Sequence, residues 1–170
     1  MVSFIGLGGN QGDRAGHLQA ALLALTEHPA VRVINVSRVY ETEFLGEGQQ
    51  DAYLNACAEV CTTLPPLAFL GFLQGIEIAE GRRPNTHLQP RPLDLDILLF
   101  GGFVQRDPGL FLPHPRMRER AFVLVPLAEI AGSEIFPDSR ETVTEACAKI
   151  RRKDGSGVAL RPEIEIWAGP

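Results

Sequence analysis

The segment from Leu93 to Phe100 is the feature that most constrains what this chain of 170 residues can fold into. Its residues are apolar apart from Asp94 and Asp96, and a Gly-Gly pair follows, so we predict a buried strand over 93–100. Side chains at i and i+2 of a strand share a face, with Cα atoms about 6.6 Å apart. Like charges placed in this way repel, and an unpaired buried charge is costly. We therefore expect a cation beside the two carboxylates.

Two kinds of cation fit this prediction. Magnesium takes hard oxygen ligands and is commonly held by one or two carboxylates together with substrate phosphates. Arginine is the alternative, because Arg82, Arg83 and Arg91 bracket the loop before the predicted strand. We favour magnesium, with the arginines holding phosphates on the same rim. The loop over 84–90 lacks a helix or strand pattern and is either a lid over a ligand or a plain surface connection.

The order of the predicted elements up to this strand is β-α-β-β-α-β. We predict strands over 2–7, 31–40, 53–63 and 93–100, a helix over 14–27 capped by Asp13, and a helix from Pro66 that ends at Gly81. The apolar stripes are expected at Leu18, Ala21, Leu22 and Leu25 in the first helix and at Leu67, Leu70, Phe72, Leu73 and Ile76 in the second. This order predicts an α+β fold with a ferredoxin-like core, an antiparallel sheet with helices packed on it.

The pattern after residue 101 is less regular and predicts a C-terminal helical extension. We expect a loop over 113–122, helices over 123–130 and 139–150, a flexible connection over 151–157, and an alternating run over 163–167 that can add a strand. The length favours a single domain over residues 1–170.

Charge and cysteine content restrict the partners and the compartment. The net charge of −5 argues against nucleic acid and anionic membranes, which both need a basic surface. No apolar N-terminal segment resembles a signal peptide, so we expect a cytoplasmic protein. Cys57 and Cys61 lie about 13 Å apart if the strand is extended, too far for a disulfide, so we expect the three cysteines to be buried free thiols.

A second kind of site is indicated by aromatic and amide residues. Tyr53 and Asn55 share a strand face, so a planar ligand can stack on the ring while the amide reads its polar edge. Phe122 follows a cationic cluster at 114–120 and can close the other side, although core packing is the alternative for each ring taken alone. The dinucleotide fingerprint and the P-loop are both absent from the sequence, so ATP chemistry would need another scaffold.

Taken together, these stretches resemble the 6-hydroxymethyl-7,8-dihydropterin pyrophosphokinase family from Phe4 to about Pro137. The matching pieces are Gly6-Leu7-Gly8-Gly9-Asn10, Tyr40-Glu41-Thr42, Tyr53-Leu54-Asn55, Gln74-Gly75-Ile76-Glu77, Gly81-Arg82, Pro90-Arg91-Pro92-Leu93-Asp94-Leu95-Asp96-Ile97-Leu98, Pro113-His114-Pro115-Arg116 and Arg120-Ala121-Phe122-Val123-Leu124. Each piece alone is weak, but their order and spacing together are specific.

The resemblance implies a ferredoxin-like fold and transfer of pyrophosphate from ATP to the hydroxymethyl group of a reduced pterin, with AMP leaving, in folate biosynthesis. It implies that Asp94 and Asp96 hold two Mg²⁺ ions and that Arg82 and Arg91 take part in catalysis. The implied ATP contacts are Gln74, Glu77, Arg82, Arg91, Ile97, His114 and Arg120, and the implied pterin pocket is Thr42, Leu45, Tyr53, Asn55 and Phe122. We expect a monomer.

The sequence departs from the family pattern mainly in the loop before the acidic pair. Leu88-Gln89 stands where the family usually has Trp-Gly, Arg83 directly follows Arg82, and Pro84 takes the place expected for the second arginine. Gly9 and Glu43 replace a common serine and a frequent proline.

Because these changes affect the lid rather than the acidic pair, we predict slower turnover than is usual in the family. A catalytically weakened regulatory paralogue that binds nucleotide or pterin is the alternative. An RNA-binding module on a similar scaffold is disfavoured by the acidic charge and by the lack of an aromatic-rich strand.

Overall fold

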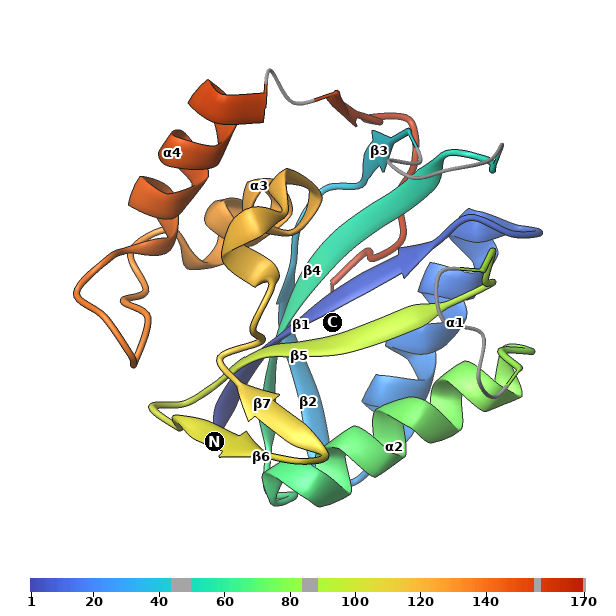
Figure 1. The fold of residues 1–170 in the computed structure, drawn as a ribbon. Helices are drawn as coiled ribbons and strands as arrows, with labels where there is room; N and C mark the ends of the chain where they lie inside the picture. Colours follow the sequence, from blue (N-terminus) through green and yellow to red (C-terminus); the bar gives the residue numbers. More distant parts are fainter. Residues whose placement is uncertain (44–49, 84–88, 155–156, 170) are drawn as a thin grey trace.

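The computed structural model describes residues 1–43, 50–83, 89–154 and 157–169, and Figure 1 shows the arrangement of their helices and strands. The strands are β1 (Val2–Gly9), β2 (Val31–Val36), β3 (Tyr40–Thr42), β4 (Tyr53–Thr62), β5 (Asp94–Phe100), β6 (Gln105–Asp107), β7 (Leu110–Leu112) and β8 (Val158–Leu160). The helices are α1 (Arg14–Glu27), α2 (Pro66–Ala79), the short 3₁₀ helix η1 (Met117–Glu119), α3 (Ala121–Ala131) and α4 (Val143–Asp154).

The main sheet confirms the predicted ferredoxin-like topology. Within the described residues its strand order is β5-β1-β4-β3-β8, and β2 also pairs with β4. Strand β1 lies in the centre and runs antiparallel to both β4 and β5. The first and fourth strands of the predicted β-α-β-β-α-β order are thus neighbours, as in ferredoxin-like sheets, and β5 forms one border of the sheet.

Helices cover both faces of this sheet, so the fold has three layers (Figure 1). Helices α1 and α2 pack on one face, and α3 and α4 pack on the other. The core under α1 and α2 contains Leu18, Leu22, Leu25, Phe69, Leu73, Leu95 and Ile97, whereas the core under α3 and α4 contains Phe4, Cys57, Leu98, Leu124, Phe136 and Val143. The two sheet faces are called the α1–α2 face and the α3–α4 face below.

Helix α1 has the predicted bounds and the predicted buried stripe. It begins after Asp13, whose Oδ1 accepts a hydrogen bond from the backbone N of Gly16 at 3.0 Å. This side chain satisfies one of the amides that a helix start leaves without a partner inside the helix.

The predicted stripe of α2 is wrong at its first member. The buried apolar side chains of this helix are Phe69, Leu73 and Ile76, which follow the i, i+4, i+7 spacing of one helix face, while Leu67 is 59% exposed. Two residues before Phe69, Leu67 is about 200° away around the helix axis and so points to solvent.

Several predicted boundaries are also corrected. The run over 31–40 is two strands, because at Ser37 the chain leaves the ladder and its hydroxyl accepts a hydrogen bond from the backbone N of Cys57 at 2.9 Å. Helix α4 begins at Val143 rather than at residue 139. Thr142 and Glu145 form a capping box there, with the Glu145 backbone N bound to Thr142 Oγ1 at 3.2 Å and the Thr142 backbone N to Glu145 Oε2 at 2.9 Å.

Several predictions for the C-terminal part of the chain are wrong. Residues 151–154 belong to α4, so the expected flexible connection is wrong for that part, and 155–156 lie outside the described residues. The run over 163–167 forms no strand, and the added strand is β8, which pairs with β3. The β6–β7 hairpin was not predicted. The cysteines Cys57, Cys61 and Cys147 are all free, as expected, but only Cys57 and Cys147 are buried, whereas Cys61 is half-buried. Each helix in the described part of the chain is too short or too polar to cross a bilayer.

Candidate active site

From Asp94 to Leu98, strand β5 alternates its side chains between the two faces; beyond this the register with β1 shifts between Phe4 and Ile5, and Leu99 joins Leu98 in the core under α3 and α4. Leu95 and Ile97 are buried with α1 and α2, whereas Leu98 is buried with α3 and α4. By the alternation of a strand, Asp94 and Asp96 share the α3–α4 face with Leu98. Both aspartates are half-buried, so the acidic pair lies at the margin of that core rather than inside it.

Two glycines separate the acidic pair from the polar end of β4. In the sheet register Gly8 lies between Asn55 and Asp94, and Gly6 lies between Cys57 and Asp96. Strands β4 and β5 are two strand spacings apart, roughly 10 Å. Gly6 and Gly8 carry no side chain, and the Leu98 and Asn55 side chains reach over them: a Cβ on Gly6 would lie 3.5 Å from Leu98 Cδ2, and one on Gly8 would lie 3.3 Å from Asn55 Oδ1.

The backbone passes unusually close to its neighbours at the end of β1. A Cβ on Gly9 would lie 2.1 Å from the carbonyl oxygen of Pro92, so only glycine fits there. Strand β1 continues through Gly9, two residues beyond the predicted end at residue 7.

Asn10 follows Gly9 and joins three segments of the chain. The side chain is 2% exposed, accepts a hydrogen bond from the backbone N of Arg91 at 2.9 Å, and donates to the Asp51 carbonyl at 3.2 Å. It also donates to Gln50 Oε1 at 3.1 Å. Asn10 thus fixes the backbone of Arg91, three residues before the acidic strand begins.

Asp94 contacts two of the predicted arginines. Arg82 Nη1 donates to Asp94 Oδ1 at 2.7 Å, and Arg91 Nη1 donates to the same oxygen at 3.0 Å. The same nitrogen of Arg82 also contacts Glu77. The arginine alternative considered for the acidic pair therefore describes the contacts of Asp94.

Glu77 is a buried support for this arrangement. Its side chain accepts a hydrogen bond from the backbone N of Leu95 at 2.7 Å, at the outer border of β5. Burial raises the pKa of Glu77, while the Leu95 amide and the Arg82 guanidinium act in the opposite direction. Glu77 thus ties α2, Arg82 and β5 together.

The neighbours of Asp96 differ from those of Asp94. His114 Nε2 lies 3.8 Å from Asp96 Oδ2. Burial and then the charge of Asp94 raise the pKa of Asp96, and the positive charges of His114 and Arg120 oppose this rise. The pKa values of His114 and Arg120 are themselves lowered, mainly by burial. The raised pKa shows that the neighbouring cations do not fully compensate this carboxylate.

The residues present fit magnesium. Asp94 and Asp96 supply hard oxygen donors on one face. Among the described residues no group of three or more His, Cys, Asp or Glu side chains is placed to hold a metal ion. Further ligands would therefore have to come from phosphate oxygens or water, which is the usual manner of magnesium binding beside a nucleotide.

One buried donor also fits an anion. Arg91 Nε is buried and has no hydrogen-bond partner among the described residues, although Nη1 of the same group contacts Asp94. A buried donor without a partner is unfavourable, and a phosphate oxygen would satisfy it.

Most of the predicted pterin residues lie on the same sheet face as the acidic pair. Thr42 pairs with Tyr53 across β3 and β4, and Asn55 Nδ2 donates to Thr42 Oγ1 at 3.0 Å. Phe122 is half-buried at the start of α3, with the Arg120 guanidinium carbon 5.6 Å from the centre of its ring. Leu45 lies outside the described residues, as do residues 84–88 of the predicted lid.

Two predicted ATP contacts stand apart from this face. The Ile97 side chain is 3% exposed in the core under α1 and α2, so any contact with a ligand on the acidic face would have to use its backbone. Gln74 is exposed on α2, one turn before Glu77. Sequence alone placed both in the site only through the family resemblance.

The ferredoxin-like sheet and its acidic, arginine-rimmed face agree with the similarity of this chain to known proteins. Residues 4–132 match the family described as 7,8-dihydro-6-hydroxymethylpterin-pyrophosphokinase (HPPK). The chain belongs to this family.

Two bacterial relatives cover nearly the whole chain. The 2-amino-4-hydroxy-6-hydroxymethyldihydropteridine pyrophosphokinase of Bacillus subtilis is 42% identical over 155 residues, which is 91% of this chain and 93% of that protein. The protein of the same name from Methylorubrum extorquens is 42% identical over 156 residues, 92% of this chain and 96% of that one.

Solved structures with the same fold are more distant in sequence. A Plasmodium falciparum HPPK-DHPS structure superposes with a TM-score of 0.71 at 16% identity and covers 95% of this chain. The chain spans about half the length of that solved protein, 48%. This similarity supports the fold alone.

Proposed function

We propose that this chain transfers pyrophosphate from ATP to the hydroxymethyl group of 6-hydroxymethyl-7,8-dihydropterin in folate biosynthesis, and that Asp94 and Asp96 hold two Mg²⁺ ions for this reaction. Family membership and the names of relatives at 42% identity support the pyrophosphoryl transfer. The observation that carries the site is the position of the acidic pair, on the same sheet face as Asn55 and Thr42.

The pterin would lie at the β3–β4 end of this face. Asn55 offers an amide to its polar edge, Thr42 holds that amide by the hydrogen bond at 3.0 Å, and Tyr53 and Phe122 offer rings for stacking. Asn55 and Asp94 flank Gly8 on its two sides in the sheet register, so the hydroxymethyl arm would extend across Gly8 toward β5. Leu45 completes the proposed pocket.

The triphosphate would lie over the aspartates, beside the surrounding basic side chains. Arg82 and Arg91 contact Asp94, His114 lies beside Asp96, and the charge of Arg120 acts on Asp96. Each guanidinium has five N–H donors, so Arg82 and Arg91 keep donors for phosphate while contacting Asp94. When bound, magnesium supplies positive charge to the phosphate oxygens and makes the attacking hydroxyl more acidic.

The remaining proposed nucleotide contacts differ in kind. Glu77 is occupied by Arg82 and the Leu95 amide, so we assign it the role of holding both in place beside the nucleotide. Gln74 contributes an exposed amide from α2, and Ile97 contributes its backbone. Catalysis then rests on alignment and charge neutralisation, the usual means in phosphoryl transfer.

The reaction is balanced without a protein base. The pterin oxygen forms a bond to the β-phosphorus of ATP, the bond from that phosphorus to the α,β-bridging oxygen breaks, and AMP leaves with the electron pair. The hydroxyl proton passes to solvent.

The test is AMP formation from ATP, with and without the pterin. We expect AMP only when the pterin and Mg²⁺ are both present. AMP formation that does not depend on the pterin would contradict the proposed substrate. Nucleotide binding without any AMP formation would favour the regulatory alternative instead.

Calorimetry with a non-hydrolysable ATP analogue tests the metal assignment. For Asp96→Ala we expect loss of the magnesium-dependent part of the binding, while the Gln74→Ala control keeps it. Magnesium-dependent binding and ordinary turnover in Asp96→Ala would show that the metal site is assigned to the wrong residues.

We also propose that residues 1–170 form one domain. Support comes from the main sheet, which joins β1 near the start of the chain to β8 near its end through β4 and β3. The monomeric state, the cytoplasmic location and the slow turnover expected from the altered lid stay predictions.

A further inference from the structure

The chain from Glu134 to Val143 forms a closed loop that leads into α4. The backbone N of Phe136 donates to the Glu141 carbonyl at 3.0 Å, and that of Val143 donates to the Glu134 carbonyl at 2.9 Å. Phe136 is fully buried in the core under α3 and α4. Backbone hydrogen bonds and a buried ring therefore fix this loop, from which Asp138 projects.

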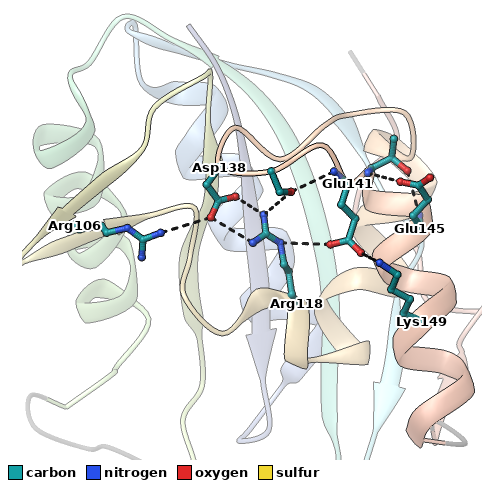
Figure 2. Close-up of polar contacts among 8 residues, drawn as sticks. Arg106, Arg118, Asp138, Glu141, Glu145 and Lys149 are labelled. Carbon is teal, nitrogen blue, oxygen red and sulfur yellow. Dashed lines mark hydrogen bonds and ion pairs between the residues drawn. The ribbon is translucent and has the colours of Figure 1, made fainter.

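The side chain of Arg118, which belongs to η1, contacts this loop (Figure 2). One guanidinium nitrogen, Nη1, donates to Asp138 Oδ2 at 3.3 Å, and the other, Nη2, contacts Asp138 Oδ1. The guanidinium carbon lies 4.1 Å from the centre of the Phe136 ring, and Nε lies 3.9 Å from Glu141 Oε2. A forked contact with a carboxylate combined with stacking on a ring fixes the orientation of the planar group.

Charged side chains around Asp138 and Glu141 further stabilise the position of Arg118. Hydrogen bonds from Arg118 are the main reason that the pKa of Asp138 is lowered, so Asp138 stays ionised at neutral pH. Lys149 of α4 donates to Glu141 Oε1 at 2.5 Å. Arg106 of β6 approaches Asp138 Oδ2 at 3.8 Å, from a side chain that is 72% exposed.

Arg118 stands between two residues that face the acidic pair. The backbone N of His114 donates to the Leu98 carbonyl at 3.0 Å, which ties that end of the segment to β5. The backbone N of Arg120 donates to the Met117 carbonyl at 3.3 Å and closes the turn of η1. Met117 is buried, while the charges of His114 and Arg120 act on Asp96. The segment is thus tied to β5 at one end and to the Asp138 loop at its middle.

We propose that Arg118 is a positioning residue. Its contacts with Asp138 and Phe136 fix the positions of Arg120 and His114 beside the bound triphosphate. The inference rests on the proposed function for the identity of that ligand. The proposal gives the chain beyond Pro137 a role in the same reaction, because Asp138, which binds Arg118, lies outside the β-α-β-β-α-β core.

Binding of a non-hydrolysable ATP analogue with Mg²⁺, measured by calorimetry, tests the proposal without needing turnover. We expect Arg118→Met to weaken this binding about tenfold, and Asp138→Asn to weaken it by a smaller factor. Arg118→Lys keeps the charge but loses the forked contact, so its affinity should lie between those of the wild type and Arg118→Met. Circular dichroism and thermal unfolding establish that each variant is folded at the titration temperature.

Arg106→Met is the matched control. It also removes a guanidinium that approaches Asp138, but Arg106 is exposed and belongs to the β6–β7 hairpin instead of η1. We expect its affinity for the analogue to stay within about twofold of the wild type. A loss in Arg106→Met as large as that in Arg118→Met would overturn the proposal, because any charge near Asp138 would then have the same effect.

A double-mutant cycle separates positioning from a merely structural role. If Arg118 acts mainly through Arg120, then Arg118→Met should weaken binding less in an Arg120→Met background than in the wild type. In turnover, KM for ATP should rise while KM for the pterin at saturating ATP stays within about twofold. Additive losses, equal rises of both KM values, or unchanged affinity in Arg118→Met would each overturn the inference.

The two proposals fail in different ways. A wild-type protein that binds the analogue but forms no AMP with the pterin contradicts the proposed function and leaves the role of Arg118 open to the binding test. A wild-type protein that does not bind the analogue overturns the role of Arg118 as well.

Discussion

The two faces of β5 have opposite tasks although their residues alternate along one strand. Leu95 and Ile97 point into the core under α1 and α2, where both are buried. Asp94 and Asp96 point to the other face, where they are half-buried and meet Arg82, Arg91 and His114. From Asp94 to Ile97, stability and chemistry are thus separated by a single step along the backbone, whereas Leu98 on the acidic face belongs to the core under α3 and α4.

This comparison shows how a charged site can be built without weakening the core that holds it. The alternation of side chains lets every apolar residue of one face pack fully while its neighbours bind charge. Substitutions on the two faces should therefore affect different quantities, activity on one and unfolding free energy on the other.

The largest expected effect sharpens this contrast at Asp96. Asp96→Asn should lower the rate of AMP formation by about 10³-fold, because a metal ligand and its charge are lost together. The unfolding free energy of the free protein should not fall at neutral pH. Folding raises the pKa of Asp96, so the ionised carboxylate opposes folding above that pKa and its removal carries no penalty. A folded Asp96→Asn protein with ordinary turnover would break the comparison.

Leu95→Ala is the partner experiment on the other face. It removes a side chain that is 3% exposed, so we expect a loss of about 2–5 kcal/mol of unfolding free energy. Denaturant titration measures this loss, and kcat per folded molecule should stay near the wild-type value. A stable but inactive Leu95→Ala protein would show that the two faces are not separate in function.

A smaller effect is expected where β1 meets the segment before β5. Gly9→Ala would place a Cβ against the Pro92 carbonyl, and the forced shift should cost about 1–3 kcal/mol of unfolding free energy. The control is Gly71→Ala in α2, where nothing lies within 4 Å and a gain of about 0.5–1 kcal/mol is expected. Thermal unfolding of the two variants should thus shift in opposite directions, and equal shifts would contradict the close contact.

The smallest effect concerns the Asp138 loop, on the α3–α4 side of the molecule. The Arg118 contact lowers the pKa of Asp138 in the folded chain, so its contribution to stability is present at neutral pH. It is lost as the pH falls through the lowered pKa, below the ordinary aspartate value of about 3.9. Asp138→Asn should cost within about 1 kcal/mol at pH 7.

The pH dependence of Tm checks this sign. The difference in Tm between wild type and Asp138→Asn should shrink as the pH is lowered below about 4. A difference that grows toward low pH would mean that the charge of Asp138 does not stabilise the fold.

The parts of the fold that local patterns determine were predictable. The cap and stripe of α1 follow from Asp13 and from helical spacing, and the alternation of β4 and β5 follows from a period of two. Strand β8 was not predictable in this way, because its three residues become a strand only by pairing with β3. A turn signal was present for the β6–β7 hairpin, since Pro108-Gly109 lies between the two short strands, and Gly109 has a φ of 135°.

In the site, too, local sequence patterns predict some contacts, whereas contacts between residues far apart in the sequence could not be predicted. Periodicity alone puts Asp94 with Asp96 and Tyr53 with Asn55. It does not bring His114 to Asp96, because that approach depends on the hydrogen bond from the His114 backbone to the Leu98 carbonyl, across a hairpin that was not foreseen. The contact between Arg118 and Asp138 likewise joins residues that are far apart in the sequence and does not follow from periodicity.

The border position of β5 has one more consequence. A strand with only one partner offers free amides and carbonyls to any other extended chain, and such borders invite aggregation. Here Glu77 takes the Leu95 amide and the His114 backbone takes the Leu98 carbonyl. The same contacts that hold the acidic pair in place therefore also protect the protein against edge-to-edge association, so weakening Glu77 should harm solubility as well as catalysis.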